Sequence, residues 1–487
     1  MWLIISKELR QLLYSPRFLI IGLTSFALIT LTVFNGYASY EAERYSAFVG
    51  RQIALDQLAS SGSYTGLPYK QVEAIRLPDK LSIFDIGIAG AVGRKGTISQ
   101  WNNSRVSESR YKQDPVLLLF GELDLSFVCG VILSLFAILF SYGAISDEKE
   151  RGTLQLIISN SVKRTSVILG KLIGLFLPLA LILLVPLLLS ILMLMIAADF
   201  TLSPNEWLRL AAMTGSMLLY LLVFLLIGLA GSALTRNSFT SFVLCLLVWV
   251  CSVVVIPKIM VHAAQQVSPS MSYQEYIETF RKFRAESRNS YERLLREYLE
   301  KHPMKEEDFR QRSNEVYEEV NDVVRREREE FFAELTREQR RKRQGMLDSA
   351  TALASISPTS CLDFALHSLS NTGPHMLEMF EESLDNYRRD FLSYAESVAE
   401  KYKEKEDLER AMSIRLSRDK DGYVQFTFNE GASDSKLDLA GMPVFAMRLP
   451  GAPQMIARAL PWLLVLALMA VIFFAAAYVA FLRYDVR

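Results

Sequence analysis

The chain has 487 residues, of which 51% are hydrophobic, and its 53 basic and 53 acidic residues cancel. The overall composition conceals two kinds of segment. Long apolar runs with almost no charge alternate with segments that are rich in both acidic and basic residues. Three of the four cysteines (Cys129, Cys245 and Cys251) lie in apolar runs and Cys361 stands alone, which excludes a disulfide framework.

Six apolar runs are long enough to cross the roughly 30 Å hydrocarbon core of a bilayer as helices, since about 18 residues suffice. We therefore expect an all-α membrane protein. Its transmembrane helices are predicted at residues 17–38, 116–142, 166–197, 207–233, 239–260 and 461–482.

Residues 1–16 are expected to form an amphipathic helix on the membrane surface. Lys7, Glu8 and Arg10 alternate there with leucines and isoleucines. Basic residues of the short loops fall on the side of the N-terminus, whereas the loop at 198–206 carries acidic residues and no basic one. The positive-inside rule then predicts that both termini are cytoplasmic.

This topology leaves residues 39–115 as the first extracytoplasmic segment. It begins with a helical pattern over 41–58 and then becomes rich in glycine and proline, which is typical of loops.

The segment 143–165 between the second and third spans is short and polar. An acidic and basic cluster from Asp147 to Arg151 is followed by Gly152 and by a helical stretch with an apolar face. We expect such a loop to dock onto a soluble partner.

The third span needs a separate argument because of its length. Its 32 residues would extend roughly 48 Å at about 1.5 Å per residue, too long for one upright crossing and too short for two. Pro178 and Pro186 favour a single kinked or tilted helix.

Residues 261–460 form the largest predicted extracytoplasmic domain. Between 271 and 345 acidic and basic residues are balanced and interspersed, as in solvated helices and unlike a one-sided nucleic-acid surface. A helical hairpin or small bundle is expected, with a further helix over 374–410 and one short strand near 423–428. A stripe is predicted to touch the bilayer surface, formed by Leu362, Phe364, Ala365 and Leu369.

Any transport by this chain requires energy from elsewhere. The ATP-binding motif Gly-x-x-x-x-Gly-Lys-[Ser/Thr] does not occur in the sequence. The cores of the predicted spans also lack the ionisable residues that ion-coupled carriers use.

The loop after the second span resembles the first cytoplasmic loop of type-2 ABC transporter permeases. The resemblance is carried by Phe140 to Leu154, by Ser159 to Arg164 and by Leu169-Gly170-Lys171. The N-terminal helix and the six-span count are similar as well. The stretches 81–87, 356–358 and 387–389 resemble a subgroup with a large external insert, akin to copper-maturation and gliding-motility permeases.

The resemblance implies that residues 153–165 form a coupling helix in a groove of a cytoplasmic ATPase. Charged side chains would contact the rim, Gly152 would permit the turn, and apolar side chains would anchor the helix. The implied coupling residues are Asp147, Glu148, Glu150, Arg151, Gly152, Thr153, Leu154, Ile157 and Ile158. The alternative is an ordinary solvated loop.

Two weaker sets of candidates complete the sites. Polar residues within or beside the spans could line a path, although such residues more often bond between packed helices; they are Asn35, Ser126, Thr214 and Tyr220. Cys361, His367 and His375 match no compact metal-ligand spacing, so no metal site is predicted.

The function expected from these features is that of a permease subunit, which is not itself an enzyme and binds no cofactor, in a bacterial inner membrane. It would pair with an identical or related permease and be driven, as an exporter, by two ATPase subunits that bind ATP and Mg²⁺. One alternative is a mechanotransmitter that works a periplasmic protein without moving substrate through its spans. Another is an ATP-independent scaffold or sensor.

Overall fold

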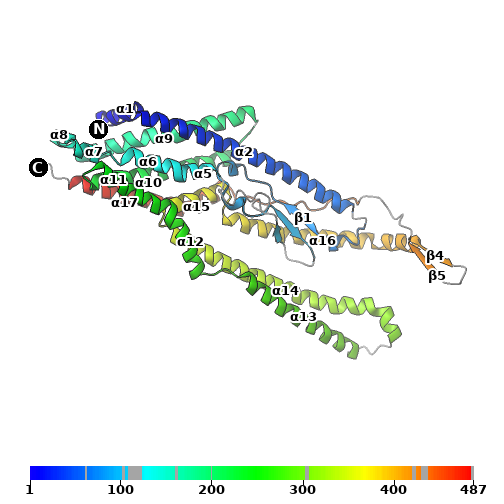
Figure 1. The fold of residues 1–487 in the computed structure, drawn as a ribbon. Helices are drawn as coiled ribbons and strands as arrows, with labels where there is room; N and C mark the ends of the chain where they lie inside the picture. The colour runs from blue at the N-terminus through cyan, green and yellow to red at the C-terminus, as the bar shows by residue number, and fades with distance from the viewer. Residues whose placement is uncertain are drawn as a thin grey trace. The chain divides into compact units, whose positions relative to one another are not determined.

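The computed structural model describes residues 1–60, 63–100, 105–107, 123–159, 163–198, 200–301, 306–418, 424–428 and 437–483. The chain divides into two compact units. The first comprises Met1–Val254 and Ser357–Arg487, and the second comprises Val255–Ile356. Figure 1 shows both termini at one end of the first unit, here called the terminal end; the opposite end is called the far end.

The described residues contain six helices long and apolar enough to cross a membrane, which confirms the predicted number. Four are single helices: α2 (Pro16–Ala59), α9 (Arg164–Ala197), α10 (Pro204–Leu234) and α17 (Ala452–Leu482). One, Leu125–Glu150, combines α5 (Leu125–Phe127), a π-helical turn (Val128–Leu133), α6 (Ser134–Ser141) and α7 (Ser146–Glu150). The last, Ser238–Val267, combines α11 (Ser238–Val250), a π-helical turn (Cys251–Val255) and α12 (Ile256–Val267).

Two of these helices differ instructively from simple crossings. The 44 residues of α2 extend about 66 Å, so the first crossing continues into the predicted helix over 41–58 without a break. Helix α9 keeps Pro178 and Pro186 within one helix, as expected from its length. The predicted start of the second span, 116–122, lies outside the described residues.

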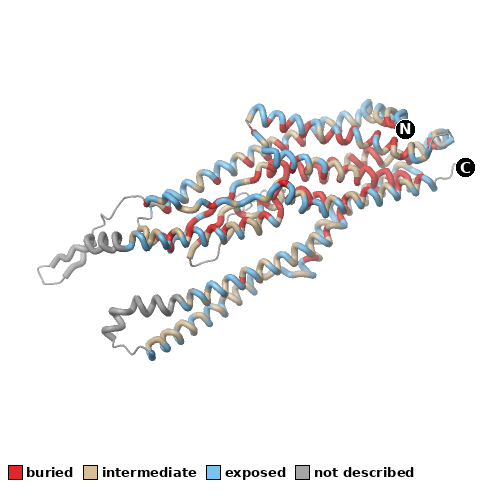
Figure 2. The backbone as a smooth tube through the Cα atoms, turned by 180° about the vertical axis from the view of Figure 1, so that it is seen from behind, coloured by how far each residue is buried: buried red, intermediate tan, exposed pale blue. Residues whose placement is uncertain are grey.

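Helix α10 is the centre of the first unit. Most of its apolar stretch is buried, whereas only 17% of the apolar stretch is buried in Ser238–Val267 and in α17. It packs against α6, α9, α11, α17 and α15 (Pro358–Ser370). Figure 2 shows how buried residues gather in this bundle.

Helix α15 corrects the expected position of an apolar stripe. Leu362, Ala365 and Leu369 are fully buried in the bundle core, and the ring of Phe364 lies 5.0 Å from that of Trp462 in α17. The stripe is therefore apolar because it packs against protein helices, and the prediction that it touches the bilayer surface was wrong.

The bonds of α15 show that it lies lengthwise beside α10. Near its start, Thr359 bonds the hydroxyl of Tyr220 in the middle of α10 at 3.1 Å. Near its end, the carbonyl of Leu369 accepts from Arg209, close to the far-end start of α10, at 2.7 Å. The two π-helical turns meet the same region, because Tyr220 donates to the carbonyl of Gly130 and Ser357 to that of Ser252.

The far end carries a second core around α16 (Pro374–Ser413) and a small antiparallel sheet of order β1-β2-β3. The strands are β1 (Val72–Ile75), β2 (Lys95–Ile98) and β3 (Arg105–Ser107), in the register Val72↔Ile98 and Gly96↔Val106. Short 3₁₀ turns precede or connect them at Leu67–Tyr69, Lys80–Ile83 and Gly87–Ala89. The sequence analysis missed this sheet, because its strands are only three or four residues long. The predicted strand is confirmed as β5 (Val424–Phe428), paired with β4 (Ile414–Arg418).

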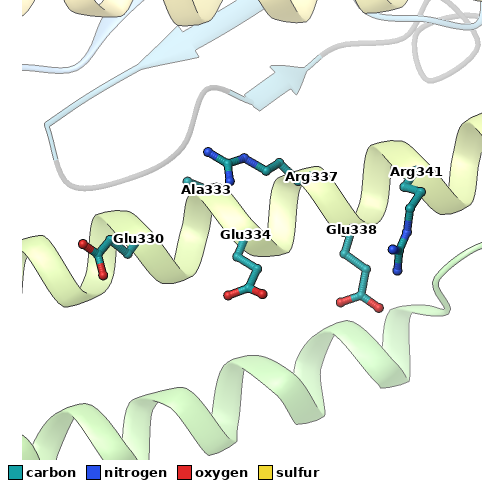
Figure 3. A pocket seen from close by; sticks show the side chains of 6 residues that line it. All are labelled: Glu330, Ala333, Glu334, Arg337, Glu338 and Arg341. Atoms are coloured by element: carbon teal, nitrogen blue, oxygen red, sulfur yellow. The ribbon is translucent and has the colours of Figure 1, made fainter.

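The second unit contains the expected helical hairpin, with α13 (Tyr273–Lys301) packed against α14 (Glu306–Ala354). Rings join the two helices, and Phe283 stacks on Phe331 at 3.8 Å between centroids. A cleft of about 520 Å³ lies on α14, and Figure 3 shows the mostly charged side chains that line it. Its lining residues are Glu330, Ala333, Glu334, Arg337, Glu338 and Arg341.

Candidate coupling site

The polar loop after the second crossing forms two short helices at the terminal end. Helix α7 (Ser146–Glu150) ends at Arg151, and α8 (Thr153–Ser159) follows after Gly152. Gly152 has φ of +72°, a left-handed conformation that costs glycine little, and a Cβ there would meet nothing within 4 Å. Its requirement for glycine therefore comes from the backbone turn. The predicted coupling helix over 153–165 is shorter than expected, because α9 already begins at Arg164.

The charged residues of α7 fasten this loop to the bundle. Asp147 accepts a hydrogen bond from the hydroxyl of Ser238, the first residue of α11, and Glu150 accepts from the backbone N–H of Ser238 at 3.3 Å. Acidic groups at a helix N-terminus are stabilising, because the free N–H groups there carry partial positive charge. This pair therefore ties α7 to α11.

Lys149 ties α7 to the C-terminal end of α10. Its Nζ donates to the carbonyls of Ala233 and Thr235, the latter at 2.9 Å, where α10 ends. A cation at a helix C-terminus satisfies carbonyls that have no partner within the helix. The hydroxyl of Ser232 reinforces the contact by accepting from the N–H groups of Ile145 and Ser146, each at 2.8 Å.

Glu148 joins a buried ion network with α9 and with α1 (Trp2–Leu13). Its Oε1 lies 2.9 Å from Nζ of Lys171 and 2.7 Å from Nζ of Lys7. Lys171 also reaches Oε1 of Glu8 at 2.9 Å and the carbonyl of Ala144 at 2.8 Å. The Lys171 side chain is only 2% exposed, which makes it the centre of the network.

Helix α1 is held against α9 at two glycines. A Cβ added at Gly174 would lie 2.7 Å from Cβ of Glu8, and one at Gly170 would lie 3.1 Å from Cβ of Ile4. Small residues four positions apart permit this close approach of two helices. Glu8 therefore faces α9 rather than the polar surface expected for it, whereas Arg10 is exposed.

Two of the implied coupling residues contact this chain itself. Glu148 is directed into the ion network, and Leu154 is fully buried in this chain's own core, while the coupling role of the whole set stays a prediction. Ile157 is partly buried against the same core, and the side chain of Ile158 lies outside the described residues. Glu150, Arg151 and Thr153 remain exposed.

The outward surface of α8 includes residues that the sequence analysis did not single out. Gln155, Leu156 and Ser159 are exposed on one side of the helix, and Leu156 is 66% exposed. Gln155 and Ser159 are four positions apart, and Leu156 and Ser159 are three apart, so both pairs lie close together on the helix surface. The sequence does show that Leu154 and Leu156 flank a polar residue, but this pattern could not show which of the two leucines faces the core.

The candidates for a path remain a prediction. Asn35 is exposed on α2, and the hydroxyl of Thr214 bonds the carbonyl of Leu210 within its own helix at 2.9 Å. The buried Tyr220 donates to Gly130 at 2.6 Å, and Ser126 donates to Asp363 at 3.2 Å. The last two bonds join neighbouring elements of the bundle.

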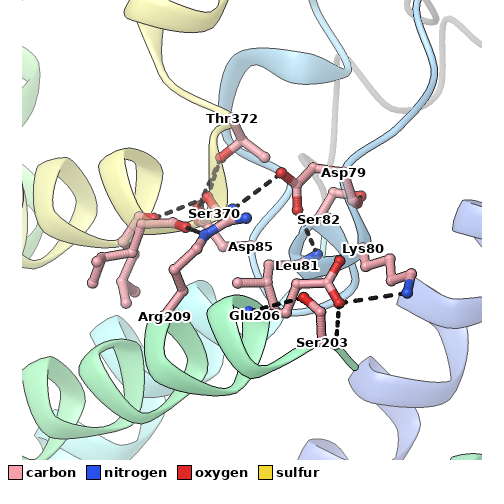
Figure 4. A network of polar contacts seen from close by, with 12 residues as sticks. Asp79, Lys80, Leu81, Ser82, Asp85, Ser203, Glu206, Arg209, Ser370 and Thr372 are labelled. Atoms are coloured by element: carbon pink, nitrogen blue, oxygen red, sulfur yellow. Dashed lines mark hydrogen bonds and ion pairs between the residues drawn. The ribbon is translucent and has the colours of Figure 1, made fainter. Parts of the chain in front are cut away.

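The far end holds a second charged network that sequence reasoning missed (Figure 4). Nη2 of Arg209 lies 3.1 Å from Oδ2 of Asp79, and both side chains are nearly fully buried. The buried Asp85 accepts from Ser370 at 2.6 Å and from Thr372 at 2.8 Å, and lies 3.0 Å from Nδ1 of His367.

Burial and like charges shift the titration of the groups around Asp85. Burial raises the pKa of Asp124 to about 7, assisted by the nearby carboxylate of Asp85. It likewise raises the pKa of Asp363 to about 6. For His367, burial opposes protonation, but Asp85 outweighs it and the pKa rises to about 9.

The three residues considered for a metal are not brought together. Cys361 is buried in the bundle core, His367 pairs with Asp85, and Nδ1 of His375 lies 3.1 Å from Glu378. Within the described part of the chain, no three His, Cys, Asp or Glu side chains gather in an arrangement that could hold a metal ion.

Comparison with known proteins adds one match. The family model described as ABC-2 family transporter protein matches residues 2–486, nearly the whole chain. No curated protein matches the chain.

Proposed function

Because the chain belongs to the ABC-2 transporter family as a multi-pass permease, we propose that a separate ATPase drives it by docking on the α7–α8 loop. The finer assignment is an exporter in which two cytoplasmic ATPase subunits, carrying ATP and Mg²⁺, work a pair of identical or related permeases. The same proposal assigns the chain to the subgroup with a large extracytoplasmic insert. Both termini face the cytoplasm of a bacterium, in accord with the basic residues of the short loops.

The observation that carries this proposal is the two-sided construction of the loop. Three consecutive charged residues, Asp147 to Lys149, bind the start of α11, the end of α10 and lysine side chains of α1 and α9, so the loop is anchored to the bundle from inside. Leu156 and Gln155 meanwhile face outward. A rigidly anchored loop with an exposed apolar residue and a charged border suits a partner that must exert force on the helices.

The docking test uses one substitution and a matched control. We expect Leu156→Asp to remove nucleotide-dependent ATPase activity from the purified complex, because a carboxylate would be desolvated at the centre of the interface. Leu77→Asp is the control, since Leu77 is 48% exposed in the far-end region. Vanadate-sensitive hydrolysis and photolabelling of a second chain with an ATP analogue are measured for both variants. Full activity in the Leu156 variant would refute docking at this face.

A mechanotransmitting function is the second candidate, and the hairpin of the second unit favours it. Helix α14 has 49 residues and would extend about 74 Å, far more than a compact loop needs. Replacing residues 280–345 by a short flexible linker should leave ATPase docking intact. If export of substrate continues in that variant, the hairpin is not the working part and the mechanotransmitter is excluded.

A further inference from the structure

We propose that Lys171 is a positioning residue that joins the α7–α8 loop to α1, so that displacement of the loop is passed to α1 and α9 together. This inference rests on the proposed function, because it assumes that a partner moves the loop. It assigns to one buried lysine the transmission of that movement.

The first argument is that Lys171 uses all of its donors. An ammonium group has three N–H donors, and Lys171 directs them to Glu8, Glu148 and the carbonyl of Ala144, at 2.8 to 2.9 Å. These three acceptors come from α1, α7 and the turn before α7. A single side chain of α9 thus fixes the loop and the N-terminal helix in one geometry.

The second argument concerns burial. Lys171, Glu8 and Glu148 are all largely withdrawn from solvent, so breaking one ion pair would leave a desolvated charge. Oε2 of Glu148 is itself buried and makes no hydrogen bond to the described residues. The carboxylate of Glu148 is therefore held through Oε1 alone, and its position depends on the two lysines.

The third argument separates Lys171 from the other contacts of α1. Gly170 and Gly174 hold α1 on α9 by close packing, which does not involve the loop. Lys7 also reaches Glu148, but its side chain is 51% exposed, and exposed ion pairs are weak and easily exchanged for water. Lys171 is therefore the buried connection between the loop and the α1–α9 pair.

Neutralising the network tests this without leaving a buried charge unpaired, since Lys7, which loses both carboxylate partners, is 51% exposed. The variant Glu8→Gln, Lys171→Met, Glu148→Gln keeps the approximate size of each side chain. Hydrogen exchange of the full complex is compared with and without ATP and vanadate, in peptides covering 2–13 and 146–159. Lys80→Met is the matched control, because it removes a lysine–glutamate contact of 3.4 Å at the far end.

In the unaltered complex and in the control, we expect protection at 146–159 together with an ATP-dependent change at 2–13. In the neutral variant, the protection at 146–159 should persist and the change at 2–13 should vanish. A neutral variant that keeps the full change at 2–13 overturns the role of Lys171. Absence of protection at 146–159 in the unaltered complex overturns the docking itself, so the two failures are distinguishable.

Discussion

The ion pair between Arg209 and Asp79 should dominate the stability of the far end. Arg209 bonds Asp79 at 3.1 Å and the carbonyl of Leu369 at 2.7 Å, and neither charged side chain has appreciable contact with solvent. Arg209→Met removes the cation, so the buried carboxylate of Asp79 loses its counter-ion and the carbonyl of Leu369 loses its donor. Breaking one partner of such a pair costs about 3–5 kcal/mol. We expect a loss of that size in the free energy of unfolding.

The assay is equilibrium unfolding of the purified chain in mixed micelles, carried through a double-mutant cycle. Asp79→Asn in the Arg209→Met background removes the stranded charge, so the double variant should be more stable than the sum of the single losses predicts. The neighbouring Lys80→Met should cost less than about 1 kcal/mol, because its pair with Glu206 is partly exposed. A loss below about 1 kcal/mol for Arg209→Met, or strict additivity, would refute the reasoning.

Three further outcomes follow from named contacts. The pKa of Asp124 is raised to about 7, so the folded state binds an extra proton between about pH 4 and 7, and stability should fall by up to about 4 kcal/mol as the pH rises through that window. Asp124→Asn should reduce this dependence in unfolding titrations and leave the part below about pH 6 to which Asp363 contributes. Gly174→Leu should release α1 from α9, because even a Cβ at this position would lie 2.7 Å from the Cβ of Glu8. Limited proteolysis near the N-terminus should then increase, and unchanged cleavage would contradict the packing. Gly152→Ala should lower the free energy of unfolding by only about 1–2 kcal/mol, because of the positive φ at this position, and should leave membrane insertion intact. Thermal unfolding and membrane fractionation measure the two effects. A larger loss of stability would point to a contact that the structure does not show.

The elements best predicted from the sequence are those whose signal is local. A long apolar run predicts a transmembrane helix irrespective of its tertiary contacts, because backbone N–H and C=O groups in a bilayer must form their hydrogen bonds within the same helix. The number of crossings, the single long α9 and the hairpin of α13 and α14 were read in this way. The three-stranded sheet was missed, since strands of three or four residues take their stability from α16 and α2 rather than from their own pattern.

The loop formed by α7 and α8 shows which contacts local sequence patterns could not predict. The run Asp147-Glu148-Lys149-Glu150 looked like a charged border for a partner, yet all four of its members bind helices of this chain. Their partners Ser238, Lys171 and Thr235 lie far along the sequence, so no spacing rule could join them. Leu156, two residues after the expected anchor Leu154, proved to be the exposed one.

The amino-acid sequence by itself indicated a multi-pass membrane protein, with six segments long and apolar enough to cross a bilayer and no ATP-binding motif, because hydrophobic length and motif chemistry are properties of short segments. Tertiary structure alone decided which charges face inward and that α15 packs beside α10. The physical reason is that burial of a charge or of an apolar stripe depends on the partner brought beside it, and packing supplies that partner from distant parts of the chain.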